Sequence, residues 1–169
     1  MIVTNVLMIL AIFLGPIVAV RLTRYLDERR EIRERKLNIF KTLMATRAYT
    51  VSWNHVEALN RIDLEFDKRN PKERRVLESW GAYLDLLGNR QLSPEQWNVK
   101  RVDLLVDLLQ SMALALKYDF DKTQIKNSSY SPQAHGNIEA EQAALRRYAL
   151  ELLEGKRAIP VKAESSSGQ

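Results

Sequence analysis

Cysteine is absent from this sequence of 169 residues, which excludes disulfide frameworks, thiolate zinc sites and cysteine nucleophiles. Histidine is nearly absent, because His55 and His135 are the only two, too few for a histidine-rich metal site. The Glu-x-x-His pattern of di-iron bundles is missing as well. The sequence therefore predicts no cofactor and no metal. Its hydrophobic share of 46% suffices for one modest domain, and a second domain is not expected.

Charge is lacking over residues 1–20 and unevenly spread afterwards. Residues 21–47 hold nine Lys or Arg against four Asp or Glu, an excess equal to the net charge of +5 for the whole chain. The rest of the chain carries no net charge, so the sequence gives no electrostatic reason to expect binding of nucleic acid there. A basic flank after an apolar run predicts that the N-terminus faces outward and that the bulk of the chain lies in the cytoplasm.

The apolar run itself, residues 2–20, reads IVTNVLMILAIFLGPIVAV. Because roughly 20 apolar residues span a bilayer, we predict a single transmembrane anchor here. A cleaved signal peptide and a buried core helix are the alternatives, although a signal peptide needs basic residues before the run. The small residues Ala11, Gly15 and Ala19 recur every four positions, which predicts a helix–helix face in the membrane. The residues predicted to set topology and contact lipid head groups are Arg21, Arg24, Arg29 and Arg30.

Helical periodicity extends over most of the remaining chain. We predict an all-α fold, in which the transmembrane helix continues into a charged helical stalk (21–47) and a cytoplasmic bundle of about four helices (52–155) follows. Cap and proline signals place helices from Ser52 to about Arg69, over 71–87 and from Pro94 to Leu116, the last as the central core helix. Residues 119–137 are predicted to be irregular, 138–155 helical, and the tail 162–169 disordered.

No catalytic set emerges from the motifs. Asp119 and Asp121 fit the D-x-D-x-T form of phosphotransferases that use an aspartate nucleophile, but that chemistry needs the end of a buried strand, and the preceding residues predict a helix. We therefore interpret this motif as a polar helix end. His55 and His135 are interpreted as structural or solvated. The three tryptophans are predicted to pack in the core rather than stack on bases: Trp53, Trp80 and Trp97.

Three stretches carry a resemblance that covers most of the chain: RKLNIFKTLMATRA (35–48), HVEALNRIDLEF (55–66) and GKRAIPV (155–161). With the start ending in GPIVAV, they resemble a bacterial family of small single-pass membrane proteins of unknown function. The resemblance implies a bacterial origin and a place in the inner membrane, but no activity. Trp53 stands where proline often follows the capping serine in that family.

These observations favour a membrane-anchored, non-catalytic interaction or assembly protein that binds a protein partner or itself. No small-molecule substrate is evident. One alternative is a membrane-anchored enzyme or nucleotide-responsive effector, which would need convergent polar residues in a pocket. Another is an oligomer that perturbs the membrane through the face of Ala11, Gly15 and Ala19.

Overall fold

The computed structural model describes residues 2–130 and 132–158, and within them every side chain except those of residues 2–13, 133–135 and 139. This part of the chain is all-helical, as predicted, and contains no strand. It divides into two compact units, Met1–Ser129 and Tyr130–Gln169. The first unit holds α1 (Ile2–Thr46), α2 (Trp53–Asn60), α3 (Ile62–Glu65), α4 (Pro71–Gly88), α5 (Pro94–Ala115) and α6 (Lys122–Asn127), and the second holds α7 (Gln133–Leu153).

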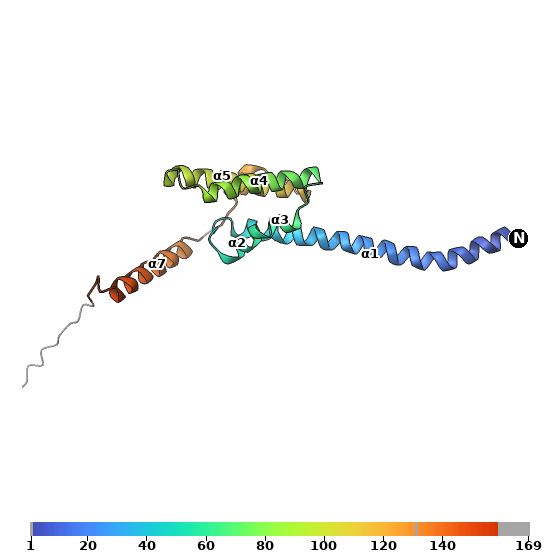
Figure 1. Cartoon of the computed structure of the whole chain (residues 1–169), viewed down its shortest axis with the longest axis horizontal. Helices are drawn as coiled ribbons and strands as arrows, with labels where there is room; N and C mark the ends of the chain where they lie inside the picture. The colour runs from blue at the N-terminus through green and yellow to red at the C-terminus, as the bar shows by residue number, and fades with distance from the viewer. Residues whose placement is uncertain (1, 131, 159–169) are drawn as a thin grey trace, which may run out of the picture. The chain divides into compact units, whose positions relative to one another are not determined.

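Helix α1 is a single helix of 45 residues that includes Pro16 (Figure 1). The predicted continuation of the first helix into the charged segment is therefore observed. Residues 14–35 are exposed, whereas Leu37, Ile39, Phe40 and Leu43 are buried in the core. The range predicted as a stalk thus contributes its second half to the core, because its apolar residues share one face of the helix.

The predicted anchor over residues 2–20 requires a correction. Among the described residues, none of the helices is both long enough and apolar enough to cross a membrane. The predictions of a single-pass transmembrane protein and of a location in the bacterial inner membrane are contradicted by this finding.

Helices α4 and α5 lie side by side and form a hairpin (Figure 1). Their starts follow the predicted signals, because Asn70 and Ser93 cap the two helices and Pro71 and Pro94 occupy the first turns. A hydrogen bond of 2.9 Å between the hydroxyl groups of Ser79 and Ser111 joins the two helices along their length.

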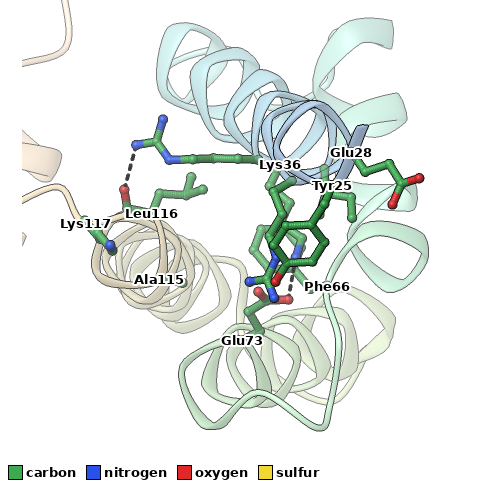
Figure 2. Close-up of a pocket in the computed structure, with 11 residues that line it drawn as sticks. Tyr25, Glu28, Lys36, Phe66, Glu73, Ala115, Leu116 and Lys117 are labelled. Atoms are coloured by element: carbon green, nitrogen blue, oxygen red, sulfur yellow. Dashed lines mark hydrogen bonds and ion pairs between the residues drawn. The ribbon is translucent and has the colours of Figure 1, made fainter. Parts of the chain in front are cut away.

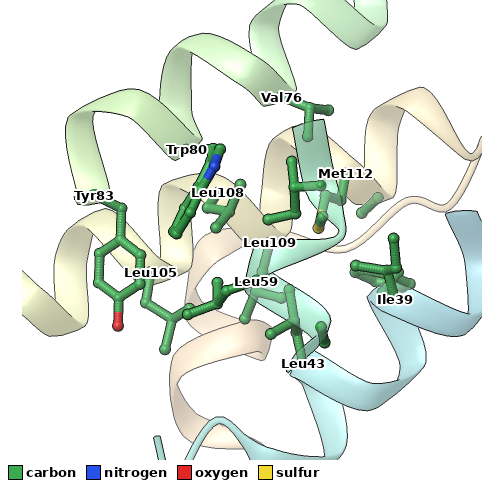
Figure 3. Close-up of a cluster of buried hydrophobic side chains, with 14 of the residues drawn as sticks. Ile39, Leu43, Leu59, Val76, Trp80, Tyr83, Leu105, Leu108, Leu109 and Met112 are labelled. Carbon is green, nitrogen blue, oxygen red and sulfur yellow. The ribbon is translucent and has the colours of Figure 1, made fainter. Parts of the chain in front are cut away.

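The core lies where the second half of α1, with α2 and α3, packs against α5 of this hairpin (Figure 3). Leu108, Leu109, Met112 and Ala113 on α5 are fully buried, which confirms α5 as the central helix. Trp80 is buried as predicted, but Trp53 is 89% exposed at the start of α2. Trp53 was therefore wrongly assigned to the core, since the apolar face of α2 is formed by other residues.

Two short elements depart from the prediction. The helix expected from Ser52 to Arg69 is broken at Arg61 into α2 and α3, and the chain is extended at Phe66. Helix α6 occupies the segment predicted to be irregular, and a capping box between Asp121 and Gln124 begins it. Lys122 and Lys126 of α6 form ion pairs of 2.7 and 3.0 Å with the carboxylates of Asp107 and Asp103 on α5.

Helix α7 forms the second unit and begins five residues before the predicted start at Ile138. It ends as predicted near Gly155, which has a φ of +71°, a conformation that glycine adopts without steric cost. The tail 162–169, predicted to be disordered, lies outside the described residues.

Candidate ligand cleft beside helix α1

The residues singled out in the first helix do not converge on a site. The side chain of Ala11 lies outside the described residues, and Gly15 and Ala19 are exposed. Apart from the neighbouring residues of α1 itself, no described atom lies within 4 Å of the position that a Cβ on Gly15 would take. Arg21 and Arg24 are exposed.

A half-open cleft of about 660 Å³ lies instead between α1, the segment before α4 and the end of α5 (Figure 2). Helix α1 lines it over three turns from Tyr25 to Lys36. The exposed side chains of Tyr25 and Ile32 supply apolar surface, and the buried side chains of Phe66 and Leu116 also line the cleft. Its charged lining residues are Glu28, Arg29, Arg33, Lys36, Glu73 and Lys117.

The carboxylate of Glu73 stabilises one wall of the cleft by accepting hydrogen bonds (Figure 2). Its Oε2 accepts hydrogen bonds from Nζ of Lys36 at 2.7 Å and from the backbone N–H of Asp67 at 2.8 Å, and Oε1 accepts one from Asn70 at 3.1 Å. The side chains of Lys36 and Glu73 are only 10% and 13% exposed. This buried pair joins α1 to the start of α4, and the positive charge of Lys36 neutralises the negative charge of Glu73.

The opposite wall is the C-terminal end of α5. Nη2 of Arg33 donates to the carbonyl oxygen of Leu116 at 3.2 Å, which satisfies one of the carbonyls that every helix leaves at its end. Lys117 follows with a φ of 66°, and Tyr118 donates its N–H to the carbonyl of Ala113 at 2.8 Å. This is a Schellman ending in which a lysine occupies the left-handed position that glycine usually takes.

The cations of the cleft outnumber its carboxylates. Arg29 lies over the ring of Tyr25, 4.8 Å from its centroid, and its neighbour Arg30 pairs with Asp27 at 3.9 Å on the helix surface. Among the described residues, Arg29, Arg33 and Lys117 form no ion pair. The cleft therefore presents net positive charge beside apolar surface.

His55 lies in the core, away from any carboxylate partner. The hydroxyl of Thr46 donates to the carbonyl of Thr42 at 2.7 Å, so Nδ1 of His55 donates to that hydroxyl at 2.8 Å. Nε2 is buried without a hydrogen-bond partner in the described structure. Burial, with a smaller contribution from the charge of Arg101, lowers the pKa of His55 to about 4. The imidazole is thus neutral at pH 7 and forms part of the packing.

The acidic side chains outside the cleft serve different elements. The side chain of Asp121 accepts from the N–H of Gln124 at 2.7 Å and caps α6, so the D-x-D-x-T motif stands at a helix start. Asp63 accepts from Nε1 of Trp80 at 3.0 Å. Within the described residues, no group of three or more His, Asp or Glu side chains could hold a metal ion.

Fold and cleft together define a class: an all-helical protein with a cationic, partly apolar cleft beside its core. The whole chain, residues 1–169, matches the model of a family of unknown function, DUF6680, and it belongs to this family. The expected membership of an uncharacterised family is confirmed. No curated protein and no solved structure matches the chain.

Proposed function

We propose that this chain, of bacterial origin as its resemblance implied, is a non-catalytic helical assembly protein that binds a second copy of itself through α7. The observation that carries the proposal is an apolar stripe on α7. Ile138, Leu145 and Leu152 recur every seven residues and are 50%, 72% and 37% exposed, and Tyr148 lies beside them at 40%. A seven-residue repeat is the pattern of a helix that packs against another helix.

The pattern of apolar residues on α7 favours a second copy of the chain as the partner of this helix. A helix of 21 residues with an apolar stripe in one face is marginal in water on its own, and packing of that face is what stabilises such helices. Homo-oligomers with two-fold symmetry use the same patch on both copies, and Leu145 lies at the centre of the stripe. Glu141 interrupts the stripe, which lowers affinity and favours one register, as polar residues do in coiled coils.

The lack of cysteine makes a direct test available. We expect Leu145→Cys to be crosslinked efficiently between chains by a short bismaleimide reagent, because two copies of residue 145 lie close together in the pair. Leu150→Cys is the matched control: Leu150 is 58% exposed on the same helix but lies off the stripe. Equal crosslinking of the two variants, or none, would contradict self-association through this face.

A second measurement follows association as the apolar stripe is strengthened or weakened. Glu141→Leu completes the apolar stripe and should shift the concentration of half-dissociation downward in sedimentation experiments, whereas Leu145→Ser should shift it upward. If the full chain sediments as a monomer at every concentration and neither variant changes this, the proposed assembly function is wrong.

A further inference from the structure

The cleft beside α1 combines positive charge with apolar surface, and its lining residues all belong to the first unit. We propose that this cleft binds a small organic anion, in which a carboxylate, sulfonate or phosphate is attached to an aromatic or aliphatic body. Its volume of about 660 Å³ lies within the range of roughly 300–1,000 Å³ typical of small-molecule sites.

The charge of the ligand follows from the cations that line the cleft. Arg33 uses one N–H on the carbonyl of Leu116, and a guanidinium has five such donors, so others remain for a ligand. Arg29 lies one turn earlier on the same face of α1, and Lys117 lies across the cleft at the end of α5. Charge-assisted hydrogen bonds from such groups are the strong ones in anion recognition.

The carboxylates of the lining do not cancel this charge. Glu73 is compensated by Lys36 at 2.7 Å. Glu28 extends away from the end of α5, on the opposite side of α1 from Lys117 (Figure 2). The side of the cleft nearest α5 is therefore left with cations only.

The apolar surface between these cations indicates that the ligand also has an apolar body. Tyr25 and Ile32 are 50% and 42% exposed and supply this surface, whereas Phe66 and Leu116, which also line the cleft, are buried. An inorganic ion would leave this surface in water. An organic anion would cover it, and removing apolar surface from water favours binding.

The conformation of Lys117 supports a role beyond folding. A lysine at φ 66° is less stable than glycine would be at the same place. Unfavourable backbone conformations of this kind are concentrated at ligand sites, where the side chain has a use. The competing explanation is that Arg33 and Lys117 only stabilise the negative end of the α5 dipole.

The test measures binding of anilinonaphthalene sulfonate, an aromatic sulfonate with environment-sensitive fluorescence, to the full chain. We expect Arg33→Gln to weaken binding roughly tenfold, as expected for one charge-assisted hydrogen bond. Arg30→Gln removes the same charge from α1 outside the cleft and should leave binding within about twofold. Inorganic phosphate should compete only weakly, because it lacks the apolar body.

Lys117→Gly separates binding from folding, since the two properties should move in opposite directions. We expect its melting temperature to rise and its affinity for the sulfonate to fall by several-fold. Equal losses of affinity for Arg33→Gln and Arg30→Gln would overturn the proposal, as would a Lys117→Gly chain that melts higher and binds as tightly as the parent. Because Leu145→Ser leaves the cleft intact, its binding of the sulfonate distinguishes this proposal from the proposed assembly through α7.

Discussion

At the scale of single residues, His55 makes the stability of the fold depend on pH. Its pKa is about 4 when folded, against about 6.5 when unfolded, so the unfolded state binds the proton more readily. The contribution of neutral His55 is complete above pH 6.5 and is lost as the pH falls from 6.5 to 4, by roughly 3 kcal/mol. Urea unfolding at a series of pH values measures this loss.

The matched variant for this prediction is His55→Asn, which keeps a donor toward Thr46 and cannot titrate. The free energy of unfolding of the parent should decline faster than that of His55→Asn between pH 6.5 and 4. Parallel curves for the two proteins would show that His55 does not couple folding to protonation.

Lys117 yields a second prediction at this scale. Replacement by glycine removes the steric cost of a left-handed lysine, and we expect a gain of about 1 kcal/mol in the free energy of unfolding. Lys117→Ala keeps the Cβ and removes the rest of the side chain with its charge, so thermal unfolding should show no comparable gain for it. A glycine variant no more stable than the alanine variant would refute the steric explanation.

At the scale of elements, the contact between α1 and α4 depends on the Lys36–Glu73 pair. We expect Glu73→Gln to cost about 2–3 kcal/mol, because it leaves a mostly buried ammonium group without its carboxylate. The control is Asp107→Asn, which breaks the Lys122–Asp107 pair of the same 2.7 Å length. That pair is about half exposed, so its loss should cost less than 1 kcal/mol. Denaturant titrations that give equal costs would contradict the role assigned to burial.

How well each element could be predicted depended on how local its signal is. The starts of α4 and α5 were predicted because Asn70 with Pro71 and Ser93 with Pro94 are adjacent in the sequence. Helix α6 was missed because its capping box lies in a run of polar residues that resembles a loop. The burial of Ile39 and Phe40 was missed because a charged helical pattern does not reveal which face a distant hairpin covers.

The cleft could not be predicted for the same reason. Its two opposing walls are connected by the hydrogen bond from Arg33 to the carbonyl oxygen of Leu116. These two residues are 83 positions apart in the chain. No spacing in the sequence relates two such positions. The φ of Lys117 is also invisible in the sequence, because lysine is the unexpected residue there.

At the scale of the whole molecule, the two units are expected to be separable. Among the residues with described side chains, the hydrophobic core cluster lies between Leu37 and Ile125. A chain shortened to residues 1–129 should therefore keep the cooperative thermal transition of the first unit within a few degrees, while losing self-association through α7. Differential scanning calorimetry with sedimentation checks both expectations. Loss of the cooperative transition would show that α7 is needed for the core to form.

Because α1 is one continuous helix, the direction in which its cleft residues point is tied to the direction of its core residues. One uninterrupted helix carries Tyr25 and Arg29 at one end of the cleft lining, and Leu37 and Leu43 in the core. Each residue turns the helix by about 100°, so the buried face fixes the direction in which the cleft residues point. A single residue gained or lost between Ile32 and Leu37 would rotate Tyr25 and Arg29 away from the cleft. The length of this helix segment is therefore as tightly constrained as the identity of its residues.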